Sequence, residues 1–250
     1  MEEIKIKTRE EIKIMAEGGR LLAKIMQELE KEVKPGTATK ELDRVAETLV
    51  LKSGGKPSFK GYEGFPNSLC ISVNEEIVHG LPSQRILKEG DIVSLDLGFY
   101  WKGFHSDMAV TLGVGKISPQ AQRLIRVAKK SLKRGIKKIK PGKTVGDIGN
   151  TVQRYVEGQG FGLVRELCGH GIGKKIHELP QVLNYGKRRT GPKIKEGMVL
   201  CLEPMLTMGD WKIEKTNDNY GYKTKDGSLS AHFEHTVAVI KDGAKILTMV

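Results

Sequence analysis

Hydrophobic residues recur at helical spacing in two parts of the chain, and each part contains a Pro-Gly break followed by a second stretch with the same spacing. The first part begins near Glu10 and breaks at Pro35-Gly36, and the second breaks at Pro141-Gly142. Apolar residues at intervals of three and four indicate amphipathic helices, and Pro-Gly ends a helix. The pattern therefore predicts two helix pairs, one in each half of the chain.

A second similarity follows the helices. The segment LCISVNEEIVHGLP at 69–82 has the same frame as LCGHGIGKKIHELP at 167–180, which sets His79 opposite His177. Repeated frames of this kind indicate an internal duplication. His170 has a serine as its counterpart in the first copy, so it breaks the symmetry of the two halves.

The duplication bounds the domain organisation. The chain has 250 residues and 38% hydrophobic content, which is enough for a substantial core. We expect one catalytic domain over residues 1–250, with internal halves of about 1–114 and 115–250. The second half is longer because of the polar, glycine-containing stretch at 207–227, which predicts an inserted loop.

Alternating apolar and polar residues predict a β-hairpin in the first half. The alternation runs through DIVSLDLGF at 91–99 and resumes around Asp107. A tight turn around Trp101-Lys102 would place Asp96 directly opposite Asp107. Two like charges in that position are destabilising unless a cation lies between them.

The second half carries acids at the equivalent positions. Glu203 aligns with Asp96, and Glu234 aligns with Asp107. The run SAHFEHTVAVI at 230–240 predicts a central, largely buried strand around Glu234. The duplication thus sets four carboxylates on core strands.

Four carboxylates on core strands need positive charge nearby, because an unpaired buried carboxylate takes up a proton. No lysine or arginine alternates onto these strand faces. Two divalent cations bridged by carboxylates would balance the charge. His170 would add one nitrogen donor to one of the cations. His79 and His177 would flank the site from opposite sides, which suits hydrogen bonding to a substrate.

The motifs SLDLG, GFHSD, GHGIG, CLEPM and FEHT resemble those of the type I methionine aminopeptidases, in order and over almost the whole chain. The resemblance implies an α+β pita-bread fold, in which two αβ halves related by a pseudo-two-fold axis surround a curved antiparallel sheet. It implies two divalent cations per chain, drawn from Co, Mn, Fe or Zn. Asp96 would bind one cation, Asp107 and Glu234 would bridge both, and His170 and Glu203 would complete the other.

The resemblance also implies an activity, which is removal of the initiator methionine from nascent proteins and peptides with a small second residue. A water or hydroxide bridging the two cations would attack the first peptide carbonyl. Glu203 would carry the proton to the leaving amine, His177 would stabilise the oxyanion, and His79 would contact the substrate.

The methionine pocket is the second set of residues that the resemblance points to. Asn74 would lie beside a monovalent cation, and Ile176 stands where several relatives carry Phe. The predicted pocket residues are Phe59, Tyr62, Phe65, Cys70 and Tyr220.

The charge of the chain is concentrated in one segment. The formal net charge is +12, and residues 116–143 hold eleven basic residues and no acidic residue. Apolar residues at helical spacing within this segment predict an amphipathic helix with a cationic outer face. That face is either a solvated surface or a docking surface for RNA, such as the ribosome.

Cellular location and assembly are the remaining expectations. No apolar run approaches the roughly 20 residues of a membrane helix, and the cysteines, three in number, show no CxxC spacing. We therefore expect a cytoplasmic protein that does not enter a membrane. No apolar helical stripe is left unassigned, which favours a monomer.

Two other functions are consistent with these motifs. A proline-directed aminopeptidase on the same fold would share all five ligands, but such relatives carry an added N-terminal domain. A non-catalytic binding protein on this fold would work through the basic segment, but such relatives lose metal ligands.

Overall fold

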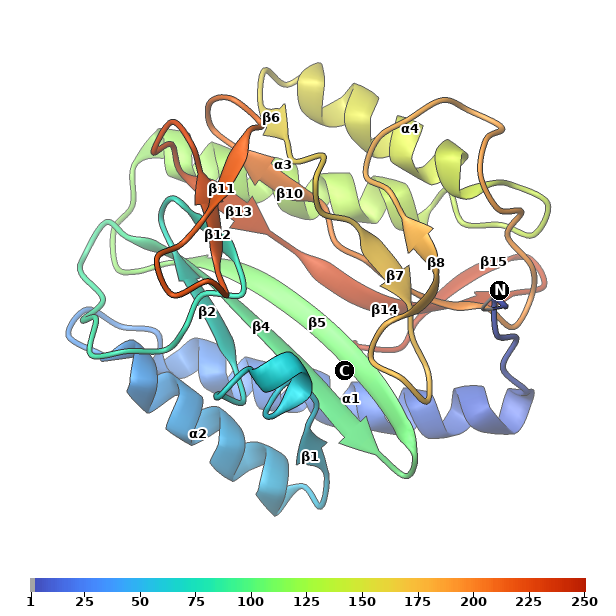
Figure 1. The fold of residues 1–250 in the computed structure, drawn as a ribbon, viewed down its shortest axis with the longest axis horizontal. Coiled ribbons are helices and arrows are strands. Elements are labelled where there is room, and N and C mark those ends of the chain that lie inside the picture. Colours follow the sequence, from blue (N-terminus) through green and yellow to red (C-terminus); the bar gives the residue numbers. More distant parts are fainter. Residues whose placement is uncertain (1–2) are drawn as a thin grey trace.

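The computed structural model describes residues 3–250 and contains the two expected helix pairs. The pairs lie on either side of the long central strands in Figure 1. Both Pro-Gly breaks fall between the helices of a pair, as predicted. The helices are α1 (Arg9–Glu32), α2 (Thr39–Lys52), α3 (Pro119–Ile136) and α4 (Val145–Glu157).

Capping residues explain where α1 and α4 begin. The Thr8 side chain accepts a hydrogen bond from the Glu11 amide, and the Glu11 carboxylate accepts one from the Thr8 amide. Thr144 and Asp147 form the same reciprocal arrangement at α4. These contacts satisfy amide donors that have no partner within the first turn.

Fifteen strands and one 3₁₀ turn, η1 (Tyr62–Gly64), complete the described elements. The strands are β1 (Lys56–Pro57), β2 (Cys70–Val73), β3 (Glu76–Val78), β4 (Ile92–Trp101), β5 (Phe104–Gly113), β6 (Gly162–Leu163), β7 (Gly169–Gly171), β8 (Glu178–Val182), β9 (Val199–Leu202), β10 (Met205–Thr207), β11 (Ile213–Lys215), β12 (Tyr222–Thr224), β13 (Ser230–His232), β14 (Glu234–Ile240) and β15 (Gly243–Ile246).

The main sheet is antiparallel and joins both halves of the chain. Its order is β1-β4-β5-β14-β9-β7-β8, with β2 added to β4 and β15 added to β14. Helix α1 packs against β4 and β5, and α3 packs against strands of the second half. The α+β class and the buried strand around Glu234 are confirmed. No helix within the described residues is long and apolar enough to cross a membrane.

The predicted loop at 207–227 is partly wrong. It contains β11 and β12, which form a small sheet with β3 of the first half. This stretch is so polar that its sequence does not show the alternation of apolar and polar residues that indicates a strand.

The register of the β4–β5 hairpin corrects another expectation. The turn centres on Lys102-Gly103, both with positive φ (47° and 91°), and not on Trp101-Lys102. Asp107 is therefore opposite Gly98, and Asp96 is opposite Ala109. The two acids remain on one face as diagonal neighbours, because a shift of two positions preserves the face.

Each helix pair makes the same contact with its half of the sheet. The Gly36 amide donates to the Leu87 carbonyl at 2.8 Å, and the Gly142 amide donates to the Ile194 carbonyl at 3.0 Å. These matched contacts give the two helix pairs equivalent positions against the sheet, and the division of one domain at about residue 114 stays a prediction.

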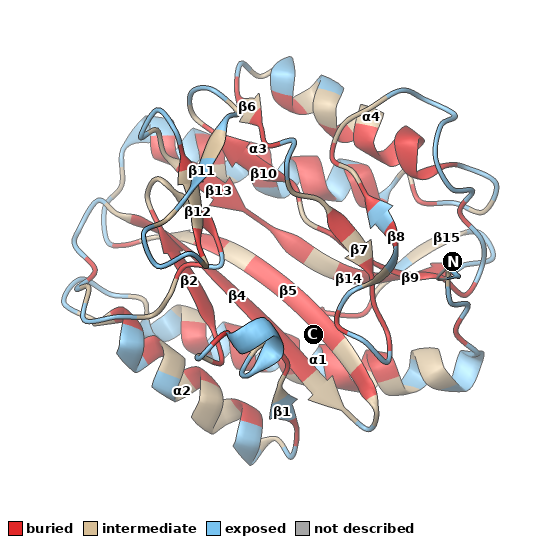
Figure 2. Ribbon diagram, viewed as in Figure 1, coloured by how far each residue is buried: buried red, intermediate tan, exposed pale blue. Residues whose placement is uncertain are grey.

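The cores follow the same division. One buried cluster joins α1 and α2 to β2, β4 and β5 and includes Leu22, Leu42 and Leu95. Another joins α3 and α4 to the second-half strands and includes Leu124 and Ile148. The buried strands run along the middle of the molecule in Figure 2. The helices therefore cover one face of the sheet, and the opposite face is left for the acidic residues.

Candidate metal centre

The acidic residues lie on one face of the main sheet, in neighbouring rows of residues that are paired across the strands. In the first row, Asp96 on β4, Ala109 on β5 and Glu234 on β14 are in register. The methyl group of Ala109 is small, so the two carboxylates on either side of it can approach each other. Asp107 lies two residues before Ala109 on β5 and so points to the same face of the sheet. One carboxylate oxygen from each of the three acids lies within 4.8 Å of the others.

Hydrogen bonds hold Asp107 to the second half of the chain. Its amide donates to Thr236 Oγ1, and the same hydroxyl donates to the Asp107 carbonyl, both at 2.8 Å. Thr236 is also in register with Cys201, which is in register with His170. A second row therefore runs from Asp107 to His170 across four strands, β5, β14, β9 and β7.

Burial leaves this acidic cluster short of partners. Asp96, Asp107 and Glu234 are 8%, 3% and 2% exposed. One oxygen of each, Oδ1 of the aspartates and Oε1 of the glutamate, has no hydrogen-bond partner among the described residues. Buried carboxylate oxygens without a protein partner fit hard divalent cations, which prefer oxygen ligands.

The same burial raises the pKa of every acid in the cluster. Loss of solvent raises the pKa of Asp96 to about 7. It also raises the pKa of Asp107, Glu203 and Glu234 well above their ordinary values, and neighbouring carboxylates add to the effect. Without a cation, these groups therefore favour the protonated form.

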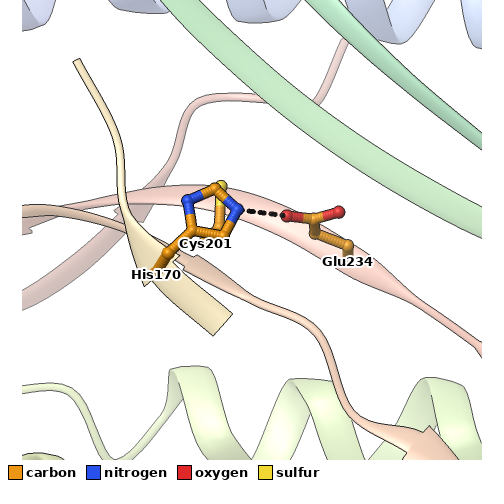
Figure 3. Close-up of side chains that lie close together, drawn as sticks. All are labelled: His170, Cys201 and Glu234. Atoms are coloured by element: carbon orange, nitrogen blue, oxygen red, sulfur yellow. Dashed lines mark ion pairs between the residues drawn. The ribbon is translucent and has the colours of Figure 1, made fainter. Parts of the chain in front are cut away.

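His170 faces the cluster from β7. Its Nδ1 lies 2.9 Å from the Gly171 carbonyl, and this contact leaves Nε2 facing Glu203 Oε1 at 3.6 Å and Glu234 Oε1 at 4.0 Å. Figure 3 shows the Glu234 carboxylate pointing toward the imidazole, with Cys201 beside the ring. Burial lowers the pKa of His170 to about 3, so the ring is neutral and can act as a ligand.

Glu203 follows β9 and lies at the edge of the cluster. Its Oε2 lies 3.8 Å from Nε2 of His232, which is 1% exposed. Neither ring nitrogen of His232 has a hydrogen-bond partner among the described residues. Sequence reasoning missed His232 and Cys201; His232 stands in the same SAHFEHT motif as Glu234 and could have been considered.

A cavity of about 350 Å³ opens onto the acidic cluster. His79 and His177 both line it. The His177 ring lies 4.4 Å from the His170 ring, and its Nδ1 lies 3.1 Å from the Tyr62 hydroxyl. His79 has a positive φ of 57° and packs edge-on against Tyr222. The structure therefore places both histidines beside the acids.

The residues expected to form the methionine pocket line this same cavity. The Phe65 and Tyr220 rings pack edge-on, and the Tyr220 hydroxyl donates to the Gly64 carbonyl at 2.9 Å. Glu63, Leu167 and Lys215 also line it and were not anticipated. The expected set is Phe59, Tyr62, Phe65, Cys70 and Tyr220.

Asn74 lies away from this cavity, in a network of its own. Its side chain donates to Asp91 Oδ1 at 2.9 Å and accepts from the Ile92 amide, and its carbonyl accepts from the Ser230 amide. A monovalent cation beside Asn74 stays a prediction.

Comparison with known proteins identifies relatives along the whole chain. The model of metallopeptidase family M24 matches residues 13–241. A methionine aminopeptidase of Clostridium perfringens is 48% identical over 245 residues, which are 98% of each chain. The crystal structure of a methionine aminopeptidase from Thermotoga maritima superposes with a TM-score of 0.98 at 42% identity, covering 99% of this chain and 100% of that one.

A prolidase from Pyrococcus furiosus has the same fold with less similarity. Its TM-score is 0.80 at 26% identity, and the match covers 98% of this chain but 65% of the prolidase. The expected pita-bread fold is confirmed by these structural neighbours.

Proposed function

The chain belongs to metallopeptidase family M24, and on this premise we propose that it removes the initiator methionine from nascent chains and peptides with a small second residue. It is a metal-dependent aminopeptidase, and its substrates carry N-terminal methionine. One observation carries the proposal. Three buried carboxylate oxygens that have no hydrogen-bond partner among the described residues converge in a cavity that is also lined by three histidines with lowered pKa values and by an apolar wall.

The cofactor is divalent metal, and we propose two ions per chain. Asp96 would hold one, Asp107 and Glu234 would lie between the two, and His170 and Glu203 would hold the other. Divalent cations bound there act as Lewis acids on the scissile carbonyl and on water. The ligand set suits Co, Mn, Fe or Zn, because it combines carboxylates with one imidazole.

Glu203 and His177 carry the remaining chemistry in this proposal. The Glu203 carboxylate takes the proton of the attacking water and returns it to the leaving amine. The Tyr62 hydroxyl lies 3.1 Å from Nδ1 of His177; when it donates there, the ring proton is on Nε2. That N–H then donates to the oxygen on which negative charge develops. His79 contacts the substrate from the other side.

The shape and lining of the cavity support a preference for methionine. Its volume of about 350 Å³ suits one large side chain, and Cys70 and aromatic rings provide an apolar, polarisable wall. Of the alternatives, a proline-directed enzyme is less favoured, because the chain is only 26% identical to the prolidase and spans 65% of it.

Methionine release tests the proposal directly. Metal-stripped protein is titrated with Mn, Co, Fe or Zn and supplied with Met-Ala-Ser or Met-Lys-Ser. We expect release only with metal and only from Met-Ala-Ser. Metal binding without release from either peptide would overturn the proposal and favour a binding protein. Release of alanine from an Ala-Pro-Ser peptide, without release of methionine from either Met peptide, would favour the proline-directed alternative.

We also propose that the basic face of α3 docks the enzyme on the ribosome in the cytoplasm. Ten of the eleven basic residues between 116 and 143 are exposed. Two of them, Lys130 and Arg134, lie over the Tyr155 ring. Salt-sensitive co-sedimentation with ribosomes should be lost when Lys129, Lys133 and Lys137 are changed to Glu. Co-sedimentation that survives this charge reversal would leave the basic face as a solvated surface.

Assembly and redox state belong to the same proposal. Cys70, Cys168 and Cys201 are unpaired thiols, which fits a reducing compartment. We propose a monomer, because neither helix pair leaves an apolar stripe uncovered. Sedimentation equilibrium of the purified protein distinguishes a monomer from a dimer.

A further inference from the structure

A buried ion pair connects the N-terminal segment to the residue that follows His177. Lys7 Nζ lies 2.7 Å from Glu178 Oε2, and the two side chains are 5% and 9% exposed. Replacing a buried ion pair by apolar side chains is often neutral for stability or favourable. The pair therefore suggests a role in holding geometry, and its surroundings support that role.

Both partners are anchored to the backbone around them. The Lys7 amide donates to the Gly197 carbonyl at 2.8 Å. The other oxygen of Glu178, Oε1, accepts from the Lys175 amide at 3.1 Å. A Cβ at Gly173 would lie 2.6 Å from Lys7 Cε and 2.7 Å from Glu178 Oε1. The pair is thus packed directly against the loop 172–178.

This loop carries His177 to the cavity. The Gly173 carbonyl accepts from the His105 amide at 2.8 Å, which fixes one end of the loop to β5. Glu178 fixes the other end, and His177 is its immediate neighbour. Lys7 does not line the cavity that holds the acids, whereas His177 does. Any effect of Lys7 on chemistry therefore passes through the loop 172–178, which Lys7 contacts at Glu178 and at Gly173.

We propose that Lys7 is a positioning residue: by holding Glu178, it fixes the loop 172–178 so that the His177 imidazole keeps its orientation toward His170 and Tyr62. The activity readout rests on the proposed function, but the orientation of His177 does not. Displacement of a catalytic group by about 1 Å costs on the order of 100-fold in rate. A loosened loop therefore lowers kcat more than it changes KM.

Two variants separate positioning from stability. Lys7→Met removes the charge with little change in length and leaves Glu178 buried without its partner. The double variant Lys7→Met with Glu178→Met replaces the pair by apolar side chains and restores packing. Lys31→Met is the matched control, because Lys31 also forms a 2.7 Å ion pair, with Glu28, but both side chains are more than half exposed.

We expect the double variant to unfold at the wild-type temperature and still show a kcat on Met-Ala-Ser that is lower by about 10- to 100-fold. KM should change by less than about twofold, and Lys31→Met should behave as wild type. If Lys7→Met alone does not fold, the comparison of wild type with the double variant carries the test. Wild-type kcat in the folded double variant would overturn the proposal.

An NMR measurement tests the orientation without activity. The imidazole signals of His177 in metal-free protein, assigned by their loss in His177→Gln, should shift in both Lys7 variants and not in Lys31→Met. Unshifted signals would overturn the positioning role even if kcat fell. Shifted signals in a chain that releases no methionine would refute the proposed function and leave the positioning role intact.

Discussion

The two halves of the molecule offer different chemistry on a similar scaffold. The first half contributes two aspartates from one continuous hairpin, whose strands pair over ten positions. The second half contributes His170, Glu203 and Glu234 from three separate elements, together with Cys201 and His232 close by. The two halves therefore differ most at His170, which has a serine as its counterpart in the first half. The first half thus provides carboxylate oxygens from one hairpin, and the second half provides its candidate ligands from separate elements.

Glu203→Gln changes a candidate catalytic residue of the second half and should have the largest effect on kcat. The amide cannot take a proton from water, so kcat on Met-Ala-Ser should fall by about 10²- to 10⁴-fold. Steady-state kinetics at saturating metal measures it. Glu196→Gln, an exposed position in the same half, is the control. Unchanged turnover in Glu203→Gln would remove this residue from the chemistry.

His170→Asp makes the two halves alike, because it replaces the imidazole by a carboxylate. Imidazole is a better ligand for Zn than for Mn, and an added carboxylate shifts the relative affinity toward Mn. We expect the affinity for Zn relative to that for Mn to fall by at least about tenfold. Competitive metal titration of stripped protein measures the ratio. A ratio that stays constant would mean that the imidazole does not set the difference between the halves.

Without metal, the free energy of unfolding should depend on pH, because carboxylates from both halves are buried close together. The pKa values of Asp107, Glu203 and Glu234 are raised well above normal by burial, so these groups bind protons in the folded state that they release on unfolding. Stability is then greater at low pH and is lost as pH rises through the folded values. Buried histidines, whose pKa values are lowered, are neutral in both states only above about pH 7.5, so they do not contribute there; below that pH they oppose the effect of the carboxylates.

Urea unfolding in EDTA measures this effect. Between pH 7.5 and 8.5, where the histidines no longer titrate in either state, the free energy of unfolding should fall by about 1 to 3 kcal/mol. The decrease should be smaller in Asp107→Asn and should be weaker with saturating Mn. A free energy that rises over this interval in metal-free protein would contradict the burial of ionisable carboxylates.

Ala109→Val tests the spacer between the two halves and should have the smallest effect. Ala109 lies in register between Asp96 and Glu234, so added methyl groups push the carboxylates apart. Overpacking of this size should weaken Mn binding by about 3- to 10-fold, as measured by calorimetry. Wild-type affinity for Mn would mean that the side chain at position 109 does not limit how closely Asp96 and Glu234 approach the ion.

Periodicity and duplication predicted the helix pairs and the strands that carry the acids, and the resemblance to the family implied the α+β class. The helix pairs and these strands depend on patterns that repeat within the chain. The register of the β4–β5 hairpin was wrong because it depends on which two residues adopt positive φ. The dipeptide Lys102-Gly103 is compatible with such a turn, but apolar periodicity does not locate it.

The candidate site was predicted less evenly. Acids and histidines stand out because the core strands leave them no charged partner in the sequence. His232 and Glu63 enter the site through contacts between distant segments, and Cys201 enters it through the pairing of β9 with β7 and β14, which the sequence pattern does not show. The small sheet of β3, β11 and β12 was missed for the same reason.

The place where the halves meet has a mechanical consequence. Strands β5 and β14 are joined in register at Glu234 with Ala109 and at His235 with Met108, a far shorter seam than the hairpin. Three of the candidate ligands, Asp107, Glu234 and His170, lie on both sides of this seam. A cation bound by these residues would therefore link the two halves and stabilise the pairing of β5 with β14. Amide hydrogen exchange along β5 and β14 would then slow when metal binds, while exchange within α2 stays unchanged.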